Sequence, residues 1–257
     1  MLSSSYLERA KKSRQPLARR ILQLMGEKET NLAFSADLRS KAHLLELVEI
    51  VGPHICVLKT HLDIIDDYEA SLPQALSALA EKHHFIILED RKFADIGSTV
   101  QDQYGGGLLR IADWADLVTV HGLPGSGIVQ GLKEVGLPKG RACLLLAEMS
   151  SSGHLLSPEY RNSVTRMAEE HSDFVIGFIA QRRLAAQSDF LYFSPGIGLN
   201  ESADALGQNY TDPRIAIKER GSDVVIVGRH IYKASDPLQL AKHYRDCAWQ
   251  AYQERLS

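Results

Sequence analysis

The sequence predicts an α/β protein, a (β/α)8 TIM barrel in a single domain, and three observations support this prediction. Short apolar runs rich in Val, Ile and Leu recur eight times along the 257 residues. Their hydrophobicity is nearly continuous rather than alternating, as in parallel strands that are covered on both faces. Most segments between them have apolar residues at helical spacing, which suits the crossovers that parallel strands need. Barrels of this length commonly form one domain, and a doubly wound open sheet is the alternative fold.

Residues 1–30 are expected to form a helical extension of one barrel domain that spans residues 1–257. The opening segment is basic and contains serine, as organellar transit peptides do, but Glu8 interrupts it. Apolar residues then follow at helical spacing: Leu17, Ile21, Leu22 and Met25. We therefore expect a helix that packs against the barrel.

Eight strands are expected along the rest of the chain, with helices between most of them. In order, the strands are 31–37, 55–62, 85–92, 117–123, 142–149, 174–180, 190–195 and 222–229. The first crossover helix should end at Gly52 and Pro53, where a left-handed residue and a missing N–H stop a helix. Another should begin at Ser157 and Pro158, a hydroxyl cap followed by proline. The link between 180 and 190 is too short for a full crossover helix.

The composition limits the kinds of partner. A net charge of -3 and a pI near 6.4 give no general attraction for nucleic acid or anionic lipid. No apolar run approaches the roughly 18 residues of a membrane span, so no membrane partner is expected. The three cysteines, Cys56, Cys143 and Cys247, are odd in number and widely separated. We interpret them as reduced thiols of a cytoplasmic protein.

Polar and ionisable residues stand at the carboxyl ends of nearly all the expected strands. They are Asp37, Lys59, His61, Asp90, Lys92, His121, Ser150, Gln181, Pro195 and Arg229. In a barrel these ends open on one face, where active sites lie. An isolated charge run such as "EDRK" at 89–92 is usually a solvated loop. Convergence from so many strands favours a functional site instead.

The ends of the second and third strands suggest a chemistry. Lys59, Asp90, Lys92 and Asp95 would form a cluster in which each carboxylate has a cation nearby. A substrate carboxylate about 4 Å from Asp90 would be repelled by roughly 4 kcal/mol at an effective dielectric of about 20. Its loss as CO2 would relieve the repulsion, and Lys92 could stabilise and protonate the carbanion. A salt-bridge network of the barrel rim is the structural alternative, and Schiff-base chemistry is disfavoured because the carboxylates keep the lysines charged.

A separate anion site is expected after the last two strands. The loop "GIGLNESADALGQNY" at 196–210 is long and polar, and the last strand ends in Gly228 and Arg229. Loops at these places in barrels frequently bind phosphate. Gly228 lets the backbone approach, and Arg229 can form paired hydrogen bonds to phosphate oxygens. Gln208 and Tyr210 could close over the anion.

No metal is expected. Asp37, His61 and Asp63 could be combined into a metal site, but Asp37 and His61 serve equally well as hydrogen-bond partners of sugar hydroxyls. The "GSG" at 125–127 lacks the spacing and context of a dinucleotide-binding motif, and we interpret it as a turn.

Five stretches also resemble a known family. They are "LKTHLDI" at 58–64, "EDRKFADIG" at 89–97, "LLLAEMSSSG" at 144–153, "DALGQNY" at 204–210 and "IVGRHI" at 226–231. Together they resemble the eukaryotic-type orotidine 5'-monophosphate decarboxylases, most specifically in the D-x-K-x-x-D core at 90–95. The likeness runs from about residue 28 to the end of the chain. It implies a homodimeric (β/α)8 barrel that converts orotidine 5'-monophosphate to UMP and CO2, the last step of de novo pyrimidine nucleotide biosynthesis, without metal or organic cofactor.

The resemblance also implies individual roles. Lys59, Asp90 and Lys92 would form the catalytic array, with Lys92 as the proton donor to C6 of the pyrimidine. Asp95 and Thr99 would reach into the partner's site, so that each active site needs two chains. Substrate contacts would come from Asp37 and His61 to ribose, Ser150 and Pro195 to the pyrimidine edge, and Gln208, Tyr210 and Arg229 to phosphate.

One residue departs from the family pattern, and two other functions stay open. His230 stands where the pattern has glycine after the arginine, which puts phosphate affinity in question. A related barrel with the same D-x-K-x-x-D core could instead act on sugar phosphates with Mg2+, as a hexulose-phosphate synthase or keto-gulonate-phosphate decarboxylase. A barrel retained for nucleotide binding or scaffolding is the alternative without catalysis.

Overall fold

The computed structural model describes residues 4–184, 189–199 and 207–257, whose eight strands form one closed parallel barrel. The strands are β1 Leu32–Ser35, β2 Val57–Thr60, β3 Ile86–Phe93, β4 Leu117–His121, β5 Ala142–Leu146, β6 Val175–Ile179, β7 Leu191–Ser194 and β8 Val224–Val227. They follow one another in chain order, and β8 pairs with β1. The predicted (β/α)8 barrel is confirmed, and the open-sheet alternative is wrong. Every strand lies within its predicted range or extends one residue beyond it.

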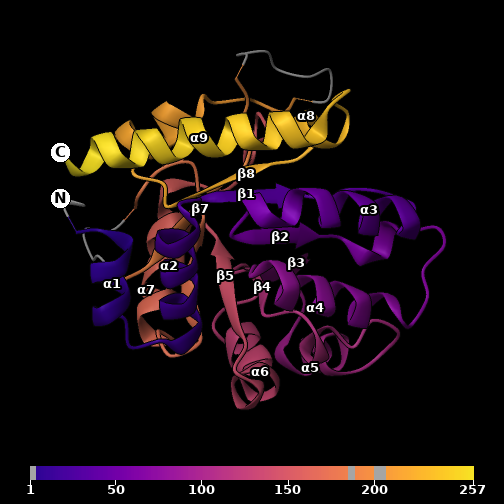
Figure 1. Cartoon of the computed structure of the whole chain (residues 1–257). Helices are drawn as coiled ribbons and strands as arrows, with labels where there is room; N and C mark the ends of the chain where they lie inside the picture. The colour runs from indigo at the N-terminus through magenta and orange to yellow at the C-terminus, as the bar shows by residue number, and fades with distance from the viewer. Residues whose placement is uncertain (1–3, 185–188, 200–206) are drawn as a thin grey trace.

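Helices surround the barrel (Figure 1). They are α1 Tyr6–Lys12, α2 Pro16–Lys28, α3 Lys41–Val51, α4 Leu72–His83, α5 Gly97–Gly105, α6 Gly127–Gly136, α7 Pro158–Glu170, α8 Arg229–Tyr232 and α9 Pro237–Leu256. Short turns of 3-10 helix cover Gly52–His54, Leu62–Ile64, Ile111–Asp113 and Leu137–Lys139, and a π-helical turn covers Ile215–Glu219. Within the described residues, no helix combines the length and apolar character that a membrane crossing requires.

Two predicted helix boundaries show how the sequence sets them. Ser157 caps α7 by accepting a hydrogen bond from the N–H of Tyr160, as its hydroxyl and the following proline predict. At the end of α3 the predicted position is correct but the predicted reason is wrong. Gly52 is right-handed, and the chain continues into a 3-10 turn. A Cβ on Gly52 would lie 2.9 Å from the ring of His83, so close packing against α4 explains the glycine.

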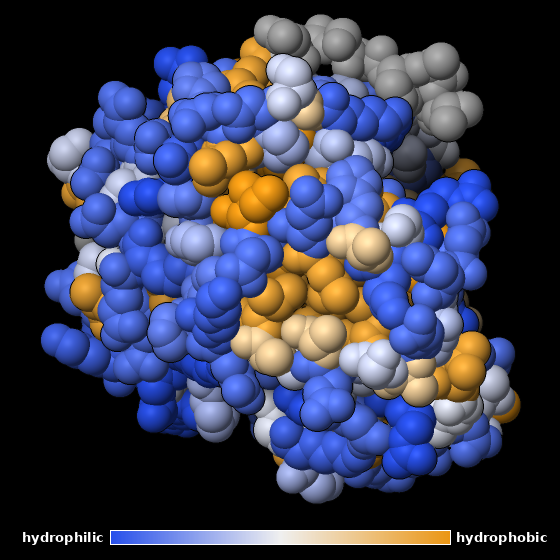
Figure 2. Space-filling view, turned by 45° about the vertical axis from the view of Figure 1, so that its right-hand side comes forward, coloured by the Kyte–Doolittle hydropathy of each residue, from blue (hydrophilic) through white to orange (hydrophobic). Residues whose placement is uncertain are grey.

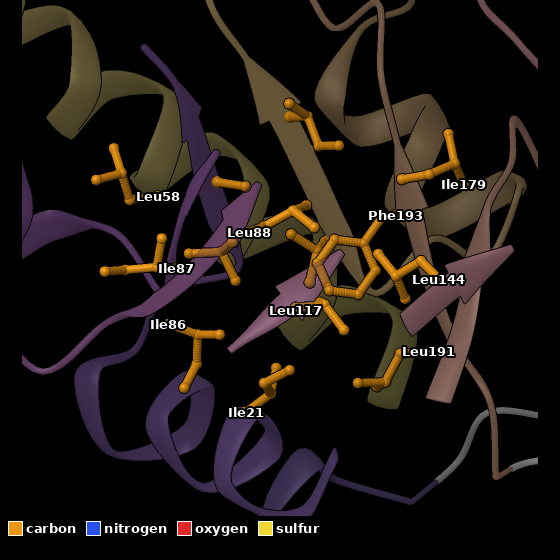
Figure 3. Packing of buried hydrophobic residues seen from close by; sticks show 14 of the residues in the cluster. Ile21, Leu58, Ile86, Ile87, Leu88, Leu117, Leu144, Ile179, Leu191 and Phe193 are labelled. Atoms are coloured by element: carbon orange, nitrogen blue, oxygen red, sulfur yellow. The ribbon is translucent and has the colours of Figure 1, made fainter. Parts of the chain in front are cut away.

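Apolar side chains from all eight strands fill the barrel. Figure 3 shows Leu117, Leu144 and Phe193 pointing toward one another from three different strands. Ile21 of α2 joins the same cluster and is fully buried. Leu22 and Met25 of that helix are at most 2% exposed. Burial of each such side chain stabilises the fold by about 1.5 to 3 kcal/mol. The helical segment before β1 is therefore part of the core.

A buried carboxylate joins both ends of the chain at the amino-terminal end of the barrel. Asp223, just before β8, accepts hydrogen bonds from Arg9 of α1 at 2.5 Å and from Arg183 at 3.0 Å. Arg255 of α9 lies 3.8 Å away. Burial alone would raise the pKa of Asp223, but Arg9 and Arg183 hold it below the usual value. This end of a barrel contributes to stability rather than catalysis.

Candidate active site

A charged array lies at the opposite end of the barrel, where β2 and β3 end side by side. Asp90 accepts hydrogen bonds at Oδ2 from the Nζ of Lys59 at 2.8 Å and the Nζ of Lys92 at 2.6 Å. Thr119 of β4 donates to the other oxygen at 2.7 Å. His61 Nε2 lies 3.2 Å from Asp90 as well. The carboxylate of Asp90 is therefore surrounded by donors from three strands.

Asp37 extends this array toward β1. Its carboxylate lies 2.7 Å from His61 Nδ1 and 3.6 Å from Lys59 Nζ, and it accepts a hydrogen bond from Ser35 at 3.0 Å. His61 thus stands between the two carboxylates of Asp37 and Asp90. Burial would lower the pKa of His61, but its hydrogen bonds to both carboxylates raise it. The predicted proximity of the β1, β2 and β3 ends is confirmed.

An irregularity in β3 aims Asp90 and Lys92 at the same space. The register between β3 and β4 shifts between Glu89 and Phe93, and Lys92 has a left-handed backbone with φ of 50°. A left-handed conformation is uncommon for a residue other than glycine and must be held by its surroundings. The Lys92 N–H donates to Thr119 Oγ1 at 3.0 Å, which provides one such restraint.

Neighbouring charges keep the array ionised. Burial of Asp90 would raise its pKa, but Lys59, His61 and Lys92 hold it well below the usual value. Burial would likewise lower the pKa of Lys59, and the charges of Asp90 and Asp37 raise it. Lys59 and Asp90 are 6% and 8% exposed, so these charges act on one another with little screening by water. Asp90 is therefore ionised, and its charge would repel a second carboxylate placed directly beside it.

The array lines a cavity of about 250 Å³ at the carboxyl ends of the strands. Eleven of the thirteen predicted site residues line it: Asp37, Lys59, His61, Asp90, Lys92, Ser150, Pro195, Gln208, Tyr210, Gly228 and Arg229. The other two, Asp95 and Thr99, do not. One cavity therefore joins the charged array to the residues predicted to bind an anion. Asp63, the third residue of the metal site considered from the sequence, is exposed and does not line the cavity.

The loops after β5 and β7 are tied together above this cavity. Ser150 donates to Gln208 Oε1 at 3.2 Å, and its carbonyl accepts from the N–H of Asn209 at 3.1 Å. Gln181, predicted at the end of β6, holds the carbonyl of Pro195 at 3.0 Å but does not line the cavity. Residues 200–206 of the predicted anion-binding loop, including part of the "DALGQNY" motif, lie outside the described residues.

Several cavity residues were missed by the sequence analysis. The apolar ones are Leu146, Met149, Ile179, Ile197 and Ile226, and the others are Ser35 and Gly196. An apolar residue at the end of a strand looks the same in sequence whether it lines a cavity or packs in the core. In the sequence Gly196 is visible only as a glycine after the seventh strand; in the structure its φ of 71° and the carbonyl of Asn209, 2.5 Å from a Cβ at this position, explain why glycine stands there.

Glu89 is a second buried carboxyl that the sequence analysis left unassigned. It points away from Asp90 and accepts hydrogen bonds from Thr60 Oγ1 at 2.7 Å and from the N–H of Leu62 at 3.1 Å. These bonds favour the ionised form, but burial outweighs them and raises the pKa of Glu89 to about 7. Glu89 thus fixes the turn that follows β2 and places His61.

We expect the Glu89→Gln protein to lose one component of the pH dependence of stability. Because the folded pKa is raised from 4.5 to about 7, the contribution of Glu89 is complete below pH 4.5 and is lost as the pH rises through 7. The loss should be about 3 kcal/mol in the free energy of unfolding. Denaturant unfolding of both proteins between pH 4.5 and 8 measures the free energy of unfolding of each. The contributions of the other carboxylates are the same in both proteins and cancel in the difference between them. Parallel curves for the two proteins would contradict this assignment.

Comparison with known proteins adds independent information. A family model described as "Orotidine 5'-phosphate decarboxylase / HUMPS family" matches residues 30–244. The orotidine 5'-phosphate decarboxylase of Schizosaccharomyces pombe is 50% identical over 255 residues, which cover 98% of this chain and 97% of that protein. That of Rhizopus oryzae is 49% identical, with 98% and 96% covered.

Two further matches differ in extent. The uridine 5'-monophosphate synthase of Bos taurus is 51% identical over 94% of this chain, which spans 50% of that protein. The crystal structure of orotidine 5'-monophosphate decarboxylase from Methanocaldococcus jannaschii, complexed with the inhibitor BMP, aligns with a TM-score of 0.68. The alignment covers 85% of this chain and 98% of that protein at 20% identity. At this identity it supports the barrel fold alone.

Proposed function

Since the chain belongs to the orotidine 5'-phosphate decarboxylase / HUMPS family, we propose that it converts orotidine 5'-monophosphate to UMP and CO2, the last step of de novo pyrimidine nucleotide biosynthesis. The observation that supports this most strongly is the position of Asp90. Its carboxylate is held ionised 2.6 Å from Lys92 Nζ, in a cavity that Arg229 also lines. The proposed reaction uses both groups, because Asp90 repels the substrate carboxylate and Lys92 supplies the proton that replaces it.

We assign the chemistry to this array. Binding of the phosphate by Gln208, Tyr210 and Arg229 supplies the energy that holds the substrate carboxylate against Asp90. The like charges repel one another, and departure of neutral CO2 removes the repulsion. The electron pair left at C6 is stabilised by the Lys92 ammonium, which then donates its proton to that carbon.

The other cavity residues orient the substrate. Asp37 accepts hydrogen bonds from ribose hydroxyls, and His61 forms a hydrogen bond with them. Lys59 holds Asp90 and Asp37 in place through its ammonium. Ser150 and Pro195 contact the pyrimidine edge from the loops after β5 and β7. Gly228 has no side chain to separate its backbone from phosphate, and a Cβ there would lie 3.1 Å from Ser35.

We further propose a homodimer whose partner completes each active site. Asp95 precedes α5 and Thr99 lies in its first turn, and neither lines the cavity of its own chain. Apolar residues stand exposed in the loops that follow β3, β4 and β5: Ile96 is 63%, Leu123 67% and Leu155 94% exposed. Figure 2 shows hydrophobic side chains gathered in a hollowed area of one face, with polar residues around them. A second copy would bury the exposed Ile96, Leu123 and Leu155 and bring Asp95 to the neighbouring cavity.

The proposed setting is the cytoplasm. Cys56, Cys143 and Cys247 are free, and the first two are buried among core residues. Free thiols are typical of reducing compartments.

Turnover in the presence of a chelator tests the reaction. We expect the absorbance of orotidine 5'-monophosphate to fall at the same rate with and without excess EDTA, because the proton donor and the anion partners are all side chains. Activity that disappears with EDTA and returns with Mg2+ would favour the metal-dependent sugar-phosphate barrel. Tight UMP binding without any turnover would favour a nucleotide-binding protein.

A further inference from the structure

His230 lies directly behind a residue of the proposed phosphate site. It follows Arg229 in the short helix α8, and it is not among the residues that line the cavity. Its imidazole stacks on the ring of Tyr210, with centroids 4.7 Å apart and 26° between the planes. Tyr210 does line the cavity. The ring of His230 therefore supports Tyr210 from outside the cavity.

The imidazole is itself anchored to the long C-terminal helix. His230 Nδ1 lies 2.8 Å from the hydroxyl of Tyr244 in α9, and the two rings are 15° from parallel. Tyr244 is 1% exposed, and its hydroxyl also accepts a hydrogen bond from the N–H of Leu199 at 3.2 Å. Tyr210, His230 and Tyr244 thus form a row that ends in the core.

The loop after β7 is packed tightly against this row. A Cβ on Gly198 would lie 2.7 Å from His230 Cε1 and 3.1 Å from Tyr210 Cδ1. Both rings therefore touch the backbone of the loop at the same point. This contact limits the positions that the Tyr210 ring can take.

The hydrogen bonds indicate how His230 acts. Because the Tyr244 hydroxyl accepts from Leu199, its own proton is available for His230 Nδ1, which then accepts. Burial and the adjacent Arg229 lower the pKa of His230, which favours the neutral ring that can accept. A neutral imidazole outside the cavity is a poor anion ligand. His230 therefore acts through Tyr210 rather than on the phosphate.

We propose that His230 is a positioning residue that fixes the ring of Tyr210 at the phosphate end of the cavity and so strengthens binding of the substrate phosphate. The proposal rests on the proposed function. It also answers how phosphate binding is affected by a histidine at position 230, where the family pattern has glycine. Here the histidine fills the space beside Tyr210 and links it to α9.

Three variants and two substrates test the proposal. His230→Ala removes the stack and the hydrogen bond, His230→Phe keeps a ring without Nδ1, and Tyr244→Phe keeps both rings without the hydroxyl. Each is assayed with orotidine 5'-monophosphate and with orotidine, which lacks the phosphate. His171→Ala, at the end of α7 and outside the cavity, is the matched control.

The expected result is a loss confined to the phosphorylated substrate. His230→Ala should lower kcat/KM for orotidine 5'-monophosphate about tenfold, through KM, and change that for orotidine less than about twofold. His230→Phe and Tyr244→Phe should fall between His230→Ala and the wild type.

Other outcomes overturn the proposal. Equal losses with both substrates would mean that His230 only supports the fold, and an unchanged kcat/KM would mean that Tyr210 needs no support. Failure of the wild-type protein to act on orotidine 5'-monophosphate would refute the proposed function instead, so the two failures are distinguishable.

Discussion

Replacing Lys92 by alanine should lower kcat for orotidine 5'-monophosphate by about a hundredfold to ten-thousandfold, the range that a positioned proton donor contributes. The loss has two sources. The variant has no ammonium to protonate C6, and the Asp90 carboxylate loses its partner at 2.6 Å. Lys59 still holds Asp90 at 2.8 Å, so the carboxylate stays paired and the barrel should fold.

The measurement is single-substrate kinetics with a thermal unfolding curve for each protein. Lys82→Ala is the control, because Lys82 of α4 forms an exposed ion pair with Glu49 of α3 and does not line the cavity. The control should keep wild-type turnover, since exposed pairs contribute about 1 kcal/mol or less to stability. A Lys92→Ala protein that keeps more than about a hundredth of wild-type turnover would show that another group is the acid.

Replacing Asp95 by alanine should abolish most of the activity although this residue lines no part of its own chain's cavity. In the proposed homodimer, each site combines Lys92 of one chain with the partner's Asp95. Mixing the inactive Lys92→Ala and Asp95→Ala proteins should therefore restore activity, because one site of each hybrid dimer has neither substitution. Random exchange of subunits predicts recovery of up to about one quarter of wild-type activity.

Asp63→Ala is the matched control for this experiment. Asp63 is also an exposed aspartate near a strand end and lies outside the cavity, so this variant should stay active alone. A loss of activity in Asp63→Ala would reopen the metal site considered from the sequence. If confirmed hybrids of the two inactive proteins show no activity, the shared site is wrong.

The fold could be predicted because its signals are local and repeated. Each strand is a short apolar run, and the segments between most runs have apolar residues at helical spacing. The reason for a boundary was harder to predict. Gly52 was expected to be left-handed, but it is a right-handed glycine that gives room to His83, a contact between residues far apart in sequence.

The site could be predicted as a set of strand ends, because parallel strands in a barrel bring these ends to one face. What could not be predicted depends on three-dimensional contacts. Thr119 lies inside a predicted strand and was not singled out from the sequence, yet its hydroxyl donates to the Asp90 carboxylate and accepts from the Lys92 N–H. The left-handed Lys92 and the stack of His230 on Tyr210 likewise have no signature in a single sequence.

The arginines around Asp223 affect the stage of synthesis at which the barrel can close. Tyr6 and Tyr252 stack and form a hydrogen bond across 246 residues of chain, beside a carboxylate that Arg9 and Arg255 share. A ribosome makes α1 before β8 and β8 before α9, so a nascent chain contains β8 before Arg255 exists. We expect β8 to dock firmly only once α9 has been synthesised, so that closure of the barrel waits for Arg255.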